Sequence, residues 1–279
     1  MIPVELLAPV RSVTDDEVAR FAEAGVVHLV GILDPRLLEA MADPLERVLA
    51  GPEVADLGAM LGSPGPTFAA GTDHFRHHDE FQDYACRSPL PEVAASLLGS
   101  DRVWLVEDSV LVKEPGSTQR TQFHTDLGYF HLSGRQICTT WAPLDPAGPE
   151  NGMVEYLPGS HLWPDDYRPN LFVDPEPLPG TLGTVVPEIV GDAALAGQLV
   201  TFDVVPGDVV VHHARTLHGA PPNSSSVRRR AISVRYAGDD VRHLRKPGVP
   251  VSAWQATAID HHELAGPGWP QVFGPAAAV

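Results

Sequence analysis

The sequence predicts one mainly β domain of the jelly-roll type, with helices of its N-terminal part packed outside the sheets. Short segments rich in β-forming residues follow one another between residues 101 and 236, separated by turn signals. No helices alternate with these strands and no glycine-rich phosphate loop follows them, which argues against a parallel βαβ fold. A chain of 279 residues with 43% hydrophobic content suits a single domain. We expect a helical part at 1–100, a jelly-roll core at 101–236 and a C-terminal tail at 237–279.

The first predicted helix has clear boundaries. Thr14 and Glu17 have the spacing of a capping box, in which each side chain bonds to the backbone N–H of the other residue. Gly25 is placed to end the helix, because glycine adopts the left-handed conformation of a helix C-terminus without steric cost. The apolar run at 26–30 then predicts an extended segment.

Two further helices and a loop are predicted before the main strands. Asp34 and Pro35 place an N-cap residue and a proline in the order preferred at a helix start. The region 51–71 is rich in Gly and Pro, which predicts a loop. A short helix is predicted at 89–98, where Gly99 ends it.

The predicted strands are short and bounded by turns. Strong turn signals occur at 146–148 and 206–208, where Pro and Gly stand close together. The predicted strands are 102–113, 135–144, 153–157, 199–205, 208–213 and 229–236.

The segment 161–198 is too long for an ordinary connection and contains many prolines. It also carries aromatic and apolar residues, among them Trp163, Tyr167 and Phe172, which a plain linker would not need. We therefore expect this insertion to form a lid over a functional site.

A pair of candidate metal ligands follows the first long strand. His124 and Asp126 are two residues apart, so in an extended chain both side chains face one side and Thr125 faces the other. His218, far downstream, can supply a second histidine. Two histidines and one carboxylate on one face of a metal suit non-haem Fe(II), because the opposite positions stay open for a chelating cosubstrate and O2.

Other histidines near carboxylates occur at 77–80 and 261–263, as expected by chance in a chain with 13 His and 36 acidic residues. These pairs lack a strand scaffold, so we expect no metal there. His131 and His161 are also not expected to be ligands. His212 and His213 precede the distal histidine in a predicted strand, and we expect them to pack beside the site.

Several motifs in fixed order resemble the phytanoyl-CoA dioxygenase family, from Phe21 to about Tyr236. The family's members are Fe(II)- and 2-oxoglutarate-dependent oxygenases, so the resemblance implies Fe(II), 2-oxoglutarate and O2, and the double-stranded β-helix form of a jelly roll, which is cupin-like. The matching motifs are His124-Thr125-Asp126-Leu127, Tyr129-Phe130, Trp141, Glu150-Asn151-Gly152-Met153, Leu157-Pro158-Gly159-Ser160-His161, His218-Gly219, Asn223 and Arg229-Arg230-Ala231-Ile232-Ser233.

The resemblance also implies roles for individual residues. His124, Asp126 and His218 would be the catalytic iron ligands. Arg229, eleven residues after the distal histidine, would bind the far carboxylate of 2-oxoglutarate, for which a planar guanidinium is suited. Strand alternation makes Arg229 point inward if its two arginine neighbours point outward. Trp141 fits the aromatic residue of the cosubstrate pocket, although an ordinary core tryptophan would fit the pattern equally well.

Two positions depart from the family's pattern. Ala220 stands where family members often have serine, so a hydroxyl contact to the cosubstrate is missing at this position. Thr125 stands where glutamine is common, which changes a polar group next to the ligands.

Composition limits the partners. The formal net charge of −17 argues against nucleic acid, whose binding needs a basic surface. No apolar stretch approaches the roughly 20 residues that cross a bilayer. We expect no signal peptide, because residues 1–10 have no basic segment leading into an apolar one. Cys86 and Cys138 are too few for a disulfide framework. We expect a cytoplasmic monomer or homodimer that binds a small-molecule substrate, without nucleic acid or membrane partners.

The expected activity is hydroxylation of a small, partly apolar metabolite in a biosynthetic pathway. The same cofactor chemistry can instead give desaturation, cyclisation or epimerisation. A metal hydrolase could use the same three ligands, but it gives no reason for Arg229. A non-catalytic jelly-roll binding protein would be expected to lose a ligand, and this chain keeps all three.

Overall fold

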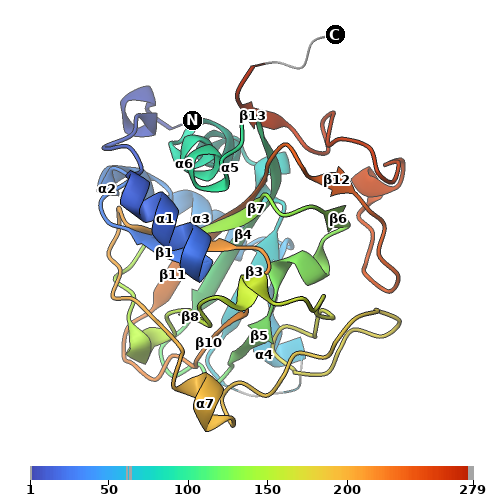
Figure 1. The fold of residues 1–279 in the computed structure, drawn as a ribbon. Helices are drawn as coiled ribbons and strands as arrows, with labels where there is room; N and C mark the ends of the chain where they lie inside the picture. Colours follow the sequence, from blue (N-terminus) through green and yellow to red (C-terminus); the bar gives the residue numbers. More distant parts are fainter. Residues whose placement is uncertain (1, 61, 63–64, 276–279) are drawn as a thin grey trace.

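The computed structural model describes residues 2–60, 62 and 65–275. Two antiparallel sheets face one another, and helices of the N-terminal part cover the outer face of the larger sheet (Figure 1). Within the described residues the architecture is therefore mainly β with flanking helices, which confirms the predicted fold class.

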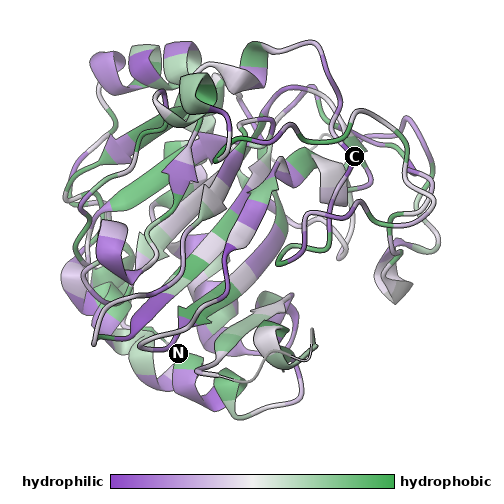
Figure 2. Cartoon of the chain, turned by 90° about the horizontal axis from the view of Figure 1, so that it is seen from below, coloured by the Kyte–Doolittle hydropathy of each residue, from purple (hydrophilic) through white to green (hydrophobic). Residues whose placement is uncertain are grey.

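The larger sheet joins strands from both ends of the chain. All of its neighbouring strands are antiparallel, and hydrophobic residues alternate with hydrophilic ones along its central strands (Figure 2). In spatial order its strands are β1 (Val26–Leu29), β9 (Val209–His213), β7 (Ile137–Pro143), β11 (Arg229–Ala237), β4 (Val103–Lys113), β3 (Phe68–Thr72) and β2 (Val54–Asp56), with β13 (Gln271–Phe273) also paired to β4.

The second sheet is smaller and carries His124 and His218. Its order is β5 (Thr121–His124), β10 (His218–Ala220) and β8 (Glu155–Tyr156). A separate pair joins β12 (Arg242–His243) to β6 (Leu132–Ser133).

The helices pack mainly against the larger sheet. Their common apolar core includes Phe21, Leu37, Leu45, Phe81 and Tyr236. The helices are α1 (Asp15–Ala24), α2 (Pro35–Ala40), α3 (Ala42–Leu49), α4 (Leu57–Met60), α5 (Asp79–Arg87), α6 (Leu90–Leu98) and α7 (Ala193–Ala196), and the short 3-10 turns are η1 (Val4–Leu7), η2 (His74–Arg76), η3 (Asp126–Tyr129), η4 (Pro149–Asn151), η5 (Ser160–Leu162) and η6 (Ala253–Gln255).

The predicted helix boundaries are confirmed where local capping decides them. Thr14 and Glu17 form the capping box of α1, and Gly25 ends this helix with a φ of 72°. Asp34 caps α2, and Gly99 ends α6 in the left-handed conformation.

The sequence prediction was wrong for two segments. The region 51–71 is not a plain loop, since it contributes β2, α4 and most of β3. Pairing of β3 with β4 overrides the weak local preference of its Gly-containing sequence. The segment 199–205 forms no strand, and only isolated bridges at Val200 and Val204 connect it to the sheets.

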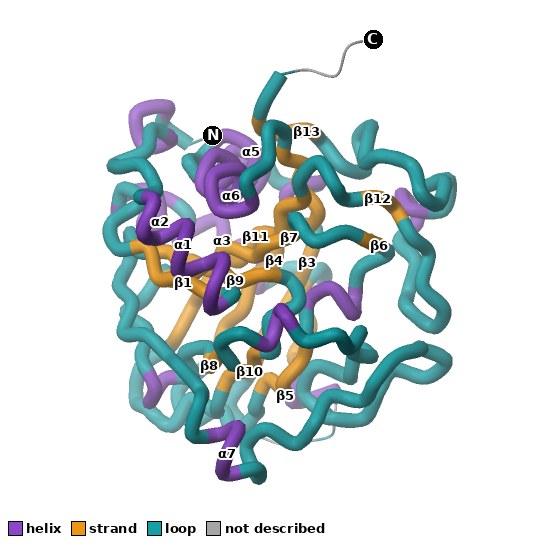
Figure 3. Tube along the Cα trace, viewed as in Figure 1, coloured by secondary structure: helices purple, strands orange, loops and turns teal. Residues whose placement is uncertain are grey.

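The insertion 161–198 is mostly loop, with η5 at its start and α7 near its end (Figure 3). Its backbone reaches the second sheet, where Gln122 N–H donates to the Phe172 carbonyl at 2.7 Å. No helix of the described part of the chain is long and apolar enough to cross a membrane.

Candidate metal centre and its two cavities

Three potential metal ligands meet at one end of the second sheet. His124 is the last residue of β5, Asp126 begins η3, and His218 begins β10 directly opposite His124. All three are buried, and one ligand atom from each lies within 4.8 Å of the others. Within the described ranges, no other group of three His, Cys, Asp or Glu residues meets this criterion.

Strand β5 ends at His124, earlier than the sequence pattern indicated, but the side chains of His124 and Asp126 still converge on one site. Thr125 remains extended, with φ −110° and ψ 135°, although the ladder of β5 stops at His124. Thr125 lines a different cavity from the one that His124 and His218 share. The expected alternation at 124–126 is therefore present in the structure.

The two oxygens of Asp126 have different surroundings. Oδ1 lies 3.5 Å from Nε2 of His124 and 3.5 Å from Nε2 of His218. Oδ2 instead accepts a hydrogen bond from the Thr139 hydroxyl and lies 3.3 Å from Nε2 of His212. Oδ1 is thus directed at the space between the histidines, while the second oxygen is anchored to the protein.

Backbone carbonyls orient both histidine rings. Nδ1 of His124 is 2.7 Å from the Gln122 carbonyl, and Nδ1 of His218 is 3.0 Å from the Thr216 carbonyl. A carbonyl can only accept, so each Nδ1 carries the proton and each Nε2 presents a lone pair. This is the usual arrangement of histidines that bind metal ions.

The electrostatics favour an ionised Asp126 carboxylate beside a neutral His218 imidazole. Burial alone would raise the pKa of Asp126, but Arg235, His218 and the neighbouring hydrogen bonds outweigh it, so this pKa lies well below its usual value. Burial, together with His212 and His124, holds the pKa of His218 well below its usual range. A carboxylate with neutral imidazoles is the protonation state in which these groups bind a cation.

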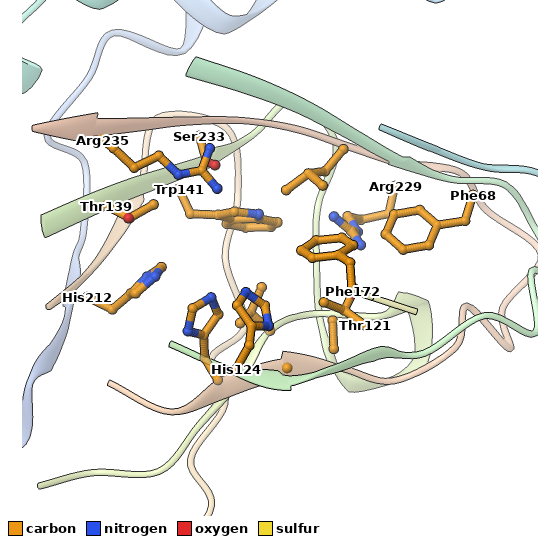
Figure 4. Close-up of a pocket in the computed structure, with 15 residues that line it drawn as sticks. Phe68, Thr121, His124, Thr139, Trp141, Phe172, His212, Arg229, Ser233 and Arg235 are labelled. Atoms are coloured by element: carbon orange, nitrogen blue, oxygen red, sulfur yellow. The ribbon is translucent and has the colours of Figure 1, made fainter. Parts of the chain in front are cut away.

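We call the first cavity at this site the inner cavity. The space between its wall atoms is about 430 Å³, a figure that includes space open to solvent, and it is lined by His124, His218, Trp141 and Arg229, among others. Arg229 and Phe68 lie at one end of the cavity in Figure 4, His212 and Thr139 lie at the other, and Trp141 lies between them. Both histidines of the metal triad and the buried arginine therefore line one cavity.

Arg229 is a buried cation that lacks an anionic partner. Its exposed fraction is 2%, and its guanidinium lies 5.6 Å from the Trp141 ring. Among the described residues, no carboxylate forms an ion pair with Arg229, and its Nε has no hydrogen-bond partner. Burial lowers the pKa of Arg229 to about 10, which leaves it charged at neutral pH. Leaving a buried charge uncompensated is costly, so the site is suited to an anionic ligand.

The neighbouring arginines point outward, as alternation along the strand predicts. Arg228 pairs with Glu46 at 2.7 Å and Glu114 at 2.8 Å. Arg230 pairs with Asp145 at 2.7 Å.

A second cavity, which we call the outer cavity, also borders the triad. The space between its wall atoms is about 1010 Å³, including space open to solvent, and its wall includes His124 and Asp126. The inner and outer cavities share wall residues, namely Leu111, His124, Phe172 and Arg235. Phe172 comes from the insertion 161–198, and its ring lies 5.2 Å from that of His124.

The remaining histidines stay outside the triad. His77 and Asp79 are exposed where η2 meets α5, and the histidines of 261–263 are also exposed. His131, His161 and His213 each have a ring nitrogen directed at a backbone carbonyl.

Sequence reasoning missed several residues of the site, above all Arg235, Thr139 and Glu107. Arg235 is six residues after Arg229 on β11, so strand alternation could have placed it on the same inward face. Thr139 on β7 and Glu107 on β4 reach the site only through the pairing of β11 with both strands. No local signal in the sequence identifies them.

Comparison with solved structures identifies the fold that the chain shares. The structure of the "non-heme alpha ketoglutarate dependent carbocyclase SnoK from nogalamycin biosynthesis" superposes with a TM-score of 0.75. This similarity covers 95% of the present chain and 98% of the SnoK chain at 24% identity. It therefore shows the shared fold.

The sequence comparison identifies the family. The profile of the phytanoyl-CoA dioxygenase (PhyH) family matches residues 21–231, so the chain belongs to this family. A "Probable alpha-ketoglutarate-dependent hypophosphite dioxygenase" of Stutzerimonas stutzeri is 32% identical over 46% of the present chain and 43% of its own length. A "Probable phytanoyl-CoA dioxygenase" of Caenorhabditis elegans is 28% identical over 56% and 50%. The match spans about half the length of these curated relatives.

Proposed function

We propose that the protein is an Fe(II)- and 2-oxoglutarate-dependent dioxygenase that oxidises a small molecule. The observation that carries this proposal is the unpaired, buried guanidinium of Arg229 in the same inner cavity as the His124, Asp126 and His218 triad. A metal site alone would suit several reactions, whereas a metal site with a buried cation in one cavity suits a chelating dicarboxylate.

The donor set fits ferrous iron. Two histidines and one carboxylate offer ligand atoms within 4.8 Å of one another, which is the donor set typical of non-haem Fe(II) oxygenases. When bound, the iron would supply the activation of O2 and the oxidising power of the reaction. The protein's own part is to fix His124, Asp126 and His218, and to keep the surrounding cavity closed to bulk water.

The inner cavity fits 2-oxoglutarate. Arg229 would bind the carboxylate at one end of the molecule, and the Trp141 ring would cover its carbon chain. The indole N–H of Trp141 has no partner among the described residues, so it can donate a hydrogen bond to the cosubstrate. Ala220 lacks the hydroxyl common in the family, but its cross-strand partner Thr121 lines the same cavity and brings a hydroxyl to this wall.

The outer cavity would hold the substrate, and we propose hydroxylation of a partly apolar metabolite, as in a biosynthetic pathway. Phe130, Phe172 and Leu57 give this cavity apolar surface next to the triad. Asp126 would supply a carboxylate ligand to the iron where a halide would otherwise bind, which would favour transfer of oxygen to the substrate. Desaturation, cyclisation and epimerisation are the alternative outcomes of the same chemistry.

The test measures succinate from 2-oxoglutarate in the presence of Fe(II), O2 and ascorbate, together with 2-oxoglutarate affinity under anaerobic conditions. We expect Fe(II)-dependent succinate release that is lost in His218→Ala and in Arg229→Ala. A metal hydrolase or a binding protein would release no succinate. Absence of both succinate release and 2-oxoglutarate binding would exclude the proposal.

A further inference from the structure

The outer cavity contains the groups that would determine which substrates bind. Besides the metal-ligand candidates His124 and Asp126, six residues with polar side chains line its wall: Glu53, Thr72, Glu107, Ser109, Tyr129 and Arg235. The hydroxyl of Tyr129 is already engaged, because it donates to Oδ1 of Asn170 at 2.7 Å. The charged side chains are therefore the main groups with which the cavity can recognise a ligand.

These charges are predominantly negative. Glu53, Glu107 and Asp126 face the outer cavity, against the single guanidinium of Arg235. Arg235 divides its charge between two carboxylates, since Nη1 lies 3.7 Å from Glu107 and Nε lies 3.7 Å from Asp126. Among the described residues, this long contact with Arg235 is the ion pair of Glu107. Burial raises the pKa of the Glu107 carboxyl to about 7, so the group is only partly charged at neutral pH, and a cation bound beside it would favour its charged form.

Glu107 is a half-buried residue of the cavity wall, and its carboxylate can accept further hydrogen bonds. It lies directly opposite Arg235 across β4 and β11, and its side chain is 26% exposed. Arg235 Nη1 donates its short hydrogen bond to the Ser109 hydroxyl instead. Within the described residues, no group donates a hydrogen bond to the Glu107 carboxylate, which has room for several donors.

Glu53 extends the negative surface along the cavity wall. Its ion-pair partner in the described chain is His78, 3.8 Å away, and this histidine carries charge only when protonated. Glu53 precedes β2, and Glu107 belongs to β4. The two carboxylates therefore come from different segments of the chain, and both line the outer cavity.

Apolar surface lies beside the carboxylates. Phe172, Leu111 and Leu57 line the outer cavity, and Phe172 also borders the metal triad. A ligand can therefore place an apolar body against these side chains while a polar group reaches Glu107.

We propose that the substrate of this site is a molecule with an apolar body and a basic amine, and that Glu107 binds the ammonium group. This inference rests on the proposed function, because it takes the outer cavity to be the substrate cavity of the metal centre. An ammonium group supplies both the donors and the positive charge that Glu107 lacks. An anionic substrate would meet Glu53 and Glu107 without a free cation to receive it.

The test uses three probes that share one apolar body and differ in charge: tryptamine (cation), tryptophol (neutral) and indole-3-acetate (anion). Equilibrium dialysis measures their affinity for the full chain, loaded anaerobically with Fe(II) and 2-oxoglutarate. The same measurement on metal-free protein shows whether any probe binds through the iron. We expect tryptamine to bind most tightly in both forms.

Three variants identify the recognising carboxylate. Glu107→Gln should weaken tryptamine roughly ten- to hundredfold and leave tryptophol almost unchanged, as expected for loss of a hydrogen bond between charged groups. Glu53→Gln should give a smaller loss, and because Glu53 makes few contacts this variant keeps the test decisive if Glu107→Gln folds poorly. Glu92→Gln is the control, since Glu92 is exposed on α6 and far from the cavity wall.

Two results would overturn the proposal. The first is that tryptamine binds no more tightly than the other probes, or does not bind at millimolar concentration. The second is that the preference for tryptamine persists in both Glu107→Gln and Glu53→Gln. The affinity of each variant for 2-oxoglutarate is measured in parallel. Retained 2-oxoglutarate binding with no amine preference rejects this inference alone, whereas loss of 2-oxoglutarate binding by the unmodified chain rejects the proposed function.

Discussion

His218 lies directly opposite His124 across the antiparallel pair of β10 and β5, with ring centroids 4.2 Å apart. Side chains directly opposite in an antiparallel pair share one face of the sheet. Residues 94 positions apart in the chain (218 minus 124) therefore become neighbours through one strand pairing. Asp126 joins them because the chain stays extended for two residues past His124.

The first prediction is that Fe(II) binding requires this triad. His124→Ala, Asp126→Ala and His218→Ala should each lower the affinity for Fe(II) by more than roughly tenfold, about 1.4 kcal/mol, because each removes one of three protein ligands. Anaerobic titration with Fe(II) measures the affinity. His77→Ala is the control and should bind iron normally, since His77 is exposed and outside the cavity. Normal iron binding by His124→Ala would contradict the assignment.

The second prediction concerns Arg229. Arg229→Ala should weaken 2-oxoglutarate by about 2–4 kcal/mol, roughly thirty- to thousandfold, because it removes a charge-assisted bidentate contact inside the protein. Iron binding should persist, since Arg229 is at the other end of the inner cavity from the anchoring residues of Asp126 (Figure 4).

Arg228→Ala is the matched control for Arg229→Ala. It removes the same side chain one residue earlier, but from an outward position paired with Glu46 and Glu114. The 2-oxoglutarate affinity of Arg228→Ala should stay near that of the unmodified chain. A larger loss in Arg228→Ala than in Arg229→Ala would show that the inward arginine has been assigned wrongly.

Local chemistry explains why part of the fold was predictable. Capping at Thr14, Asp34 and Gly99 depends on residues next to the helix end, so the sequence pattern suffices. The inward direction of Arg229 follows from alternation along one strand. The strands at 54–56 and 68–72 were missed because they form through sheet pairing, β2 with β3 and β3 with β4, and not through local propensity.

The outer cavity shows what sequence reasoning could not reach. Glu107 faces Arg235 only because β4 and β11 pair in a particular register, with an irregularity just after Arg235. A shift of this register by one residue would turn Glu107 to the other face of the sheet. Such a register depends on the whole sheet, so the substrate-binding groups became visible only in the structure.

The third prediction tests the N-terminal capping box. The hydrogen bond from Arg11 lowers the pKa of Glu17 to about 2, with Thr14 adding to the effect against the opposing effect of burial. A lowered carboxyl pKa stabilises the fold fully above the unfolded pKa of 4.5, and this stabilisation is lost as the pH falls from about 4.5 to about 2. Glu17→Gln should therefore cost about 1–2 kcal/mol at pH 7 and little at pH 2.

Urea unfolding of Glu17→Gln at several pH values checks this prediction. Asp16→Asn is the control, because Asp16 is exposed and pairs only with the exposed Arg20. A destabilisation by Glu17→Gln that does not change between pH 7 and pH 2 would show that packing, and not the charge of Glu17, stabilises the helix start.

The fourth prediction is that 161–198 closes over the site when ligands bind. Asn170 ties this insertion to the second sheet, donating to the Phe123 carbonyl at 2.9 Å, and Phe172 lies against His124. Leu171 and Leu182 of the same segment are exposed and accessible to chymotrypsin. Cleavage in the segment should slow when Fe(II), 2-oxoglutarate and an amine probe are added anaerobically. Equal rates with and without ligands would favour a passive linker.

The last prediction concerns the anchor of Asp126. Thr139→Val removes the hydroxyl that donates to Oδ2 of Asp126 and keeps the shape of the side chain, so the carboxylate should lose its fixed orientation. Fe(II) affinity should fall roughly ten- to hundredfold, as is typical when a partner of a metal ligand is removed. Thr140→Val is the control, because the neighbouring Thr140 donates to the Val234 carbonyl and does not contact the triad. Equal Fe(II) affinities of Thr139→Val and Thr140→Val would show that His212 and Arg235 hold Asp126 without the hydroxyl.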